Sequence, residues 1–128
     1  MPRAHAISSI AVAVLLTSAC TACTSLTSTT RIDPGMSFLL GGGQTGAFVV
    51  RGTNSGSVPV IVYVARDGRR DSVGTIPPRG EIDAEFASRA MAVFRNPSTS
   101  SAAEVSIRVT GATSSLGMGY ERGVTPKP

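Results

Sequence analysis

The stretch VSIRVT, at residues 105–110, has the clearest secondary-structure pattern in the chain. Three β-branched apolar side chains, Val105, Ile107 and Val109, alternate with polar ones and so fall on one face of an extended segment. A period of two with one apolar face is typical of a β-strand that packs one side against a core. Residues 81–86, EIDAEF, repeat this alternation.

The neighbouring parts of the chain are short apolar segments separated by turn-forming residues. Residues 58–64, VPVIVYV, are apolar on both faces, which predicts an interior strand. Asp67-Gly68 lies between two such segments and predicts a two-residue hairpin turn. Together these patterns predict eight strands, at residues 36–40, 47–51, 58–66, 72–76, 81–86, 91–95, 103–110 and 116–120.

Seven or eight short strands, without a convincing helical stripe, predict an all-β domain at residues 36–121. The expected architecture is a small antiparallel β-sandwich, immunoglobulin-like in outline, and a small barrel is the alternative. Residues 122–128, which end in TPKP, are expected to form a disordered tail.

Residues 1–19 have the composition of an export signal peptide. A basic start with Arg3 precedes an apolar run at residues 7–16, and small residues follow at 17–19. The apolar run is roughly half the length of the ~20 residues that a membrane-spanning helix needs. We therefore expect export, with residues 20–35, rich in Ser and Thr, forming a flexible tether ahead of the domain.

The junction Leu16-Thr-Ser-Ala-Cys20 resembles the lipobox of bacterial lipoproteins, in which a Leu and two small residues precede the Cys at the cleavage site. It departs from that pattern because Leu16 lies four positions before Cys20 instead of three. The resemblance implies acyl chains such as palmitate on Cys20 and a cell-envelope protein held by lipid at the outer membrane. Two alternatives remain open. An ordinary signal peptidase cutting after Ala19 would release a soluble periplasmic or extracellular protein, and an uncleaved segment would act as an anchor itself.

The distribution of His and Cys restricts the chemistry of the mature chain. His5 is the only histidine, and Cys20 and Cys23 are the only cysteines. Removal of residues 1–19 leaves no Ser–His or Cys–His pair and no zinc site built on His or Cys. The C-x-x-C pair lies at a cleavage site, outside the folded setting that redox chemistry requires. We therefore predict a protein that is not an enzyme, with no metal and no cofactor apart from the lipid on Cys20.

The segment FLLGGGQTGAF, at residues 38–48, carries glycines with the spacing G-x-G-x-x-G. A dinucleotide site needs a helix after the last glycine, whereas residues 47–51 predict a strand, and no Lys-Ser/Thr follows for a P-loop. We therefore predict no nucleotide binding and interpret the segment as a hairpin loop whose glycines permit positive φ. Such loops often bind partners, and the candidate binding residues are Gly41, Gly42, Gly43 and Gln44.

Three carboxylates, Glu81, Asp83 and Glu85, fall on one face of a predicted strand. The favoured interpretation is a solvated face whose charges pair across the sheet with arginines such as Arg95 or Arg108. A calcium site and an acid–base pair for glycoside hydrolysis are the alternatives.

Arg66, Arg69 and Arg70 surround the Asp67-Gly68 turn and form a second candidate binding loop. They fit contact with lipid head groups or another anionic polymer, and equally a charged hairpin tip that only maintains solubility. Of the 12 basic residues only Arg3 lies in the signal, so the remainder of the chain keeps a small basic excess over its 8 acidic residues. An excess of this size predicts no nucleic-acid partner.

These observations predict a non-enzymatic, lipid-anchored envelope protein that acts as a structural or protein-interaction module with an envelope protein as partner. The alternatives are a freely secreted binding domain, with calcium at Glu81, Asp83 and Glu85, and a hydrolase that uses carboxylates. An exposed strand edge or a loop would supply the binding surface.

Overall fold

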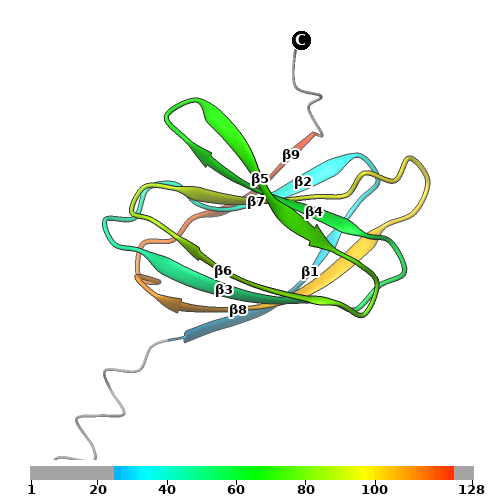
Figure 1. Ribbon diagram of the computed structural model, residues 1–128, viewed down its shortest axis with the longest axis horizontal. Helices are drawn as coiled ribbons and strands as arrows, with labels where there is room; N and C mark the ends of the chain where they lie inside the picture. The colour runs from blue at the N-terminus through cyan, green and yellow to red at the C-terminus, as the bar shows by residue number, and fades with distance from the viewer. Residues whose placement is uncertain (1–24, 123–128) are drawn as a thin grey trace, which may run out of the picture.

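A computed structural model describes residues 25–122, which fold into two antiparallel sheets packed face to face (Figure 1). One sheet has four strands in the order β1-β8-β3-β6, and the other has five in the order β5-β4-β7-β2-β9. The all-β prediction and the antiparallel sandwich are confirmed. The strands are β1 (Ser25–Ile32), β2 (Met36–Gly41), β3 (Phe48–Asn54), β4 (Val60–Arg66), β5 (Arg69–Ile76), β6 (Glu81–Phe86), β7 (Met91–Arg95), β8 (Ala103–Gly111) and β9 (Met118–Arg122).

The core lies between the two sheets and is built from the alternating side chains that define the strands. In β8, Val105, Ile107 and Val109 are buried while Arg108 is exposed, as the period of two requires. The rings of Phe48 and Phe86 stack in the core with their centroids 5.2 Å apart. Burial of each such large apolar side chain stabilises the fold by about 1.5–3 kcal/mol. Residues 25–122 contain no cysteine, so within them these inner faces hold the sandwich without a disulfide.

All eight predicted strands are present, with ends displaced by a few residues. The segment predicted as an interior strand is β4, which lies between β5 and β7. The last strand begins at Met118 and continues through Arg122, one residue beyond the predicted end of the domain.

The predicted strand count of seven or eight is wrong by one, because the predicted tether contains β1. This strand pairs along its whole length with β8, from Ser25 opposite Thr110 to Ile32 opposite Ala103. Its inward positions include Ser28 and the buried Thr30, so the segment has a period of two in burial but not in hydrophobicity. The Ser/Thr composition therefore concealed the strand, although Thr itself favours extended structure.

The loops gather at two ends of the sandwich. The proximal end is defined as the end at which β1 begins, and it holds loops 42–47, 67–68, 87–90 and 112–117. The distal end holds loops 33–35, 55–59, 77–80 and 96–102. In Figure 1 the chain enters β1 at the lower left, the other proximal loops lie along the left of the molecule, and the tip of the β4–β5 hairpin lies at the upper left.

Two buried asparagines hold the distal loops. The Asn54 amide donates to the carbonyls of Val58 and Ile76 at 2.7 and 2.9 Å, and its oxygen accepts from the Gly56 amide at 2.9 Å. Asn96 makes the equivalent set of contacts to loop 96–102 and to the end of β1. Both side chains are fully buried, so each amide satisfies backbone groups that water cannot reach.

Candidate functional site

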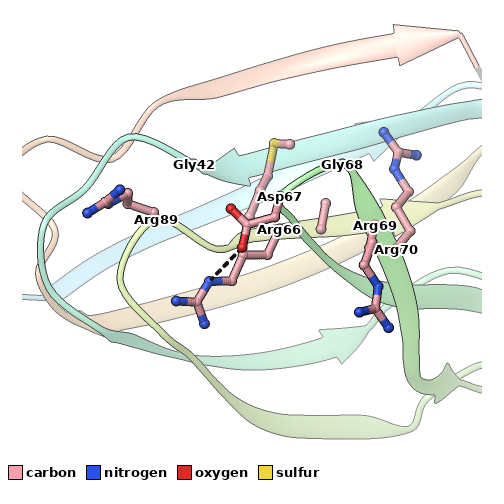
Figure 2. Close-up of a pocket in the computed structure, with 9 residues that line it drawn as sticks. Gly42, Arg66, Asp67, Gly68, Arg69, Arg70 and Arg89 are labelled. Carbon is pink, nitrogen blue, oxygen red and sulfur yellow. Dashed lines mark ion pairs between the residues drawn. The ribbon is translucent and has the colours of Figure 1, made fainter.

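An open pocket of about 390 Å³ lies at the proximal end, between the tip of the β4–β5 hairpin and two loops (Figure 2). It joins the two candidate binding loops, since Gly42 and the hairpin arginines line the same space. Four of its side chains are arginines and only one is acidic. The lining residues are Gly42, Ala65, Arg66, Asp67, Gly68, Arg69, Arg70, Arg89 and Met91.

The hairpin turn sets the positions of the first arginines. Asp67 and Gly68 have φ angles of 52° and 77°, so both central residues adopt the left-handed conformation of a type I′ turn. Arg66 and Arg69 are consequently paired directly across the hairpin. The predicted two-residue hairpin is confirmed.

Two of the arginines have acidic neighbours. One guanidinium nitrogen of Arg70, Nη2, donates to both carboxylate oxygens of Glu121, at 2.8 and 3.2 Å, and this ion pair joins β5 to β9, the two edge strands of the five-stranded sheet. Arg66 lies 3.8 Å from Asp67, whose side chain is 87% exposed, so that pair contributes almost nothing to stability.

Arg69 and Arg89 form no ion pair with any residue between 25 and 122. Figure 2 shows them on opposite sides of the hairpin tip. Both side chains belong to exposed residues, so their charges are available to an anion from solvent.

Gln44 holds the glycine loop against the loop that carries Arg89. Its side-chain nitrogen donates to the carbonyls of Ala87 and Ala90 at 3.2 and 3.0 Å, and its side-chain oxygen accepts from the Gly42 amide at 2.8 Å. Its backbone carbonyl accepts from the Arg89 amide at 3.0 Å. Gln44 is completely buried, so it acts as a structural link behind the pocket and its side chain does not reach a ligand.

Sequence reasoning did not find Arg89. This residue has a φ of 65° in the turn between β6 and β7, a conformation that non-glycine residues seldom adopt. No local pattern indicates it, because only the packing of that turn against Gln44 brings Arg89 to the hairpin arginines.

The glycine segment is a connection between sheets, and its interpretation as a hairpin loop is wrong. It joins β2 of one sheet to β3 of the other, and these strands do not pair. The positive φ angles are confirmed at Gly41 and Gly42, at 94° and 108°. A Cβ on Gly41 would lie 3.0 Å from the ring of Phe48, so this glycine is required by close packing as well as by φ. Because β3 follows the glycines, the segment lacks the helix of a dinucleotide site.

The three carboxylates of β6 follow an exposed edge of the four-stranded sheet. Asp83 accepts from Arg51 of β3 at 3.2 Å, so the expected pairing across the sheet is found, but with a different arginine. Arg108 lies one strand further away, opposite Arg51, and Arg95 belongs to the other sheet. Within residues 25–122, Glu81, Asp83 and Glu85 belong to no group of side chains arranged to hold a metal ion.

No model of a known protein family matches the chain, and no curated protein matches it either. In the part of the chain that the structure describes, no helix is long and apolar enough to cross a membrane. Cys20, Cys23 and the predicted signal lie outside the described residues.

Proposed function

We propose that this chain is a non-enzymatic interaction module of the cell envelope, anchored by lipid at Cys20, which binds a protein partner through the edge strand β9. The observation that carries the proposal is the exposure of this strand. Met118 and Tyr120 are 48% and 54% exposed, and they are two of the three large hydrophobic residues exposed between positions 25 and 122.

Two of the other three edge strands, β6 and β5, are protected against strand pairing, as natural sheet edges usually are. The third, β1, exposes the polar side chains Ser25, Thr27 and Thr29 and no large hydrophobic one. β6 carries three carboxylates, and β5 carries Arg69, Arg70 and Asp71 together with a bulge opposite Val62 and Tyr63. By contrast β9 begins Met-Gly-Tyr, without a charge until Glu121. An extended partner segment that added to β9 would form main-chain hydrogen bonds and cover both exposed side chains.

The amino-acid content supports a role without catalysis. From residue 24 onwards the chain contains no His and no Cys, so general acid–base work would fall to carboxylates, to the two tyrosines and to Lys127. The tilted contact of Tyr120 with Phe38, with ring centroids 5.4 Å apart, places this side chain at the rim of the core as a packing surface.

Two measurements test the proposal. Intact mass of the membrane-extracted protein is expected to give a chain that starts at Cys20 with added acyl mass, and the Cys20→Ser variant should lose that mass. An unacylated chain in the soluble fraction would reject the anchor and leave a secreted module.

The second measurement places the photo-crosslinker p-benzoylphenylalanine at position 118 or 120, with position 73 as the matched control. Val73 is 40% exposed on β5, the opposite edge of the same sheet. We expect one defined crosslinked protein from the β9 positions and none from position 73. Equal crosslinking at all three positions, or none at β9, would reject binding at this edge.

A further inference from the structure

The start of β1 limits how far the domain lies from Cys20. Only four residues separate Cys20 from Ser25, the first residue of β1. A fully extended chain of that length spans at most about 17 Å. If Cys20 carries the proposed lipid, the proximal end of the sandwich is therefore held at the membrane surface, whereas a tether up to residue 35 would have left its orientation free.

The arginine pocket lies at this same proximal end. Arg66 and Arg69 flank the proximal loop 67–68, Arg70 follows Arg69 on β5, and Arg89 lies within loop 87–90, with Asp67 as the single acidic residue in those loops. Counted in the same way, with the residue on each side of every loop included, the distal loops have two arginines, Arg79 and Arg95, balanced by two acidic residues, Asp33 and Glu81. The basic charge of the loops is thus concentrated at the end from which the chain leads back to Cys20.

The pocket is also built to present this charge. The type I′ turn holds Arg66 opposite Arg69, and the buried Gln44 fixes the backbone that carries Arg89. Arg69 and Arg89 have no ion pair within residues 25–122, and guanidinium groups match phosphate oxygens in geometry and charge.

We infer that the arginine pocket binds the phosphate groups of an anionic lipid surface through Arg66, Arg69 and Arg89. The choice of a lipid surface as the ligand rests on the proposed anchor at Cys20, but binding of lipid phosphate by the pocket can be measured without that anchor. In the envelope, the contact would hold the sandwich upright on its proximal end and leave the distal loops pointing away from the bilayer.

The test measures binding of the full chain with Cys20→Ser to vesicles, so that acylation cannot contribute. Vesicles of phosphatidylethanolamine with phosphatidylglycerol are compared with neutral phosphatidylcholine vesicles at low and high salt. We expect binding to the anionic vesicles that weakens steeply with salt. Each exposed cation at such a surface changes binding by about fivefold, so Arg66→Gln, Arg69→Gln and Arg89→Gln together should weaken it by about a hundredfold.

A second triple variant separates the pocket from net charge. Arg79→Gln, Arg108→Gln and Arg122→Gln remove the same charge from exposed positions outside the pocket, and they should weaken binding by less than about tenfold. Equal losses in both triple variants, or no preference of the Cys20→Ser chain for anionic vesicles, would overturn the inference. Competition by millimolar inorganic phosphate without any vesicle preference would also overturn it, because the site would then serve a soluble anion.

The proposed function and this inference fail separately. A chain without acyl mass that still binds anionic vesicles through the pocket rejects the anchor and supports the lipid-phosphate site. An acylated chain whose pocket variant binds vesicles as the wild type does supports the anchor and rejects the site.

Discussion

Replacement of Gln44 by leucine is expected to lower the free energy of unfolding of the domain. Gln44 is buried behind the arginine pocket, where it links two of the proximal loops. The substitution keeps the side-chain volume nearly unchanged but removes three hydrogen bonds, one to the Gly42 amide and two to the carbonyls of Ala87 and Ala90. A typical hydrogen bond contributes about 1 kcal/mol net, so the expected loss is about 3 kcal/mol. The buried carbonyl of Ala90 would be left without this donor.

Urea denaturation measures this loss directly. With a slope of about 1.5 kcal/mol per molar urea for a domain of this size, the unfolding midpoint should fall by about 2 M. Thr45→Ala is the matched control, because Thr45 is exposed in the same loop, and its midpoint should stay within about 0.3 M of the wild type. If the two variants had equal midpoints, Gln44 would not be the link between the loops.

The same variant tests how Arg89 is positioned. Without the side chain of Gln44, the amides of Gly42 and Arg89 should exchange hydrogen faster, since Gly42 loses its acceptor and loop 87–90 loses two hydrogen bonds.

The Gln44→Glu variant makes the stability of the domain depend on pH. At neutral pH its carboxylate would face two carbonyl oxygens in the interior, and burial raises the pKa of a carboxyl group. Stability relative to the wild type should therefore rise as the pH falls through that raised pKa, because the folded state binds the proton more tightly.

Three further substitutions test other parts of the fold by thermal or urea unfolding. Gly41→Ala should cost about 1–3 kcal/mol, because φ is 94° and the new Cβ would lie 3.0 Å from a core phenylalanine ring, whereas Gly43→Ala, which meets open space, should change stability by less than about 0.5 kcal/mol. Ile32→Ala should lower the free energy of unfolding by about 2–4 kcal/mol, because Ile32 of β1 is fully buried in the sandwich. Thr29→Ala, at an exposed position of the same strand, should leave stability close to that of the wild type. Equal, small losses in both variants would show that this segment is not packed as a strand. Asn54→Ala should cost about 2–4 kcal/mol, because it leaves two buried carbonyls and one amide of the distal loops without their partner, and a loss below about 0.5 kcal/mol would contradict that role.

The strands were predictable wherever burial and hydrophobicity have the same period. In β8 and β6 every inward position is apolar, so the alternation is visible in the sequence itself. In β1 the inward Ser28 and Thr30 are covered by neighbouring elements without being apolar, so the period exists only in the folded chain. The Asp67-Gly68 turn was predictable because its geometry depends on two adjacent residues.

The candidate site was predictable only in pieces. The hairpin arginines and Gly42 were predicted as candidate binding residues in two separate loops, since one loop is marked by its charge and the other by its glycine content. Their meeting in one pocket depends on the connection of β2 to β3 between sheets and on the buried Gln44, which looks in the sequence like any polar loop residue. Arg89 was missed because it enters the site through a turn far from the others in the chain.

The amino-acid sequence by itself determined the positions of eight strands, the antiparallel β class and the restricted chemistry of a chain whose only histidine is His5. These properties follow from side-chain periodicity, short-range turn geometry and composition, each of which acts within a few residues. The tertiary structure alone decided that β1 is a strand, that Arg51 is the partner of Asp83, and that four arginines share the proximal end. Those outcomes depend on which strands become neighbours, and that is settled by the packing of all the inner faces together.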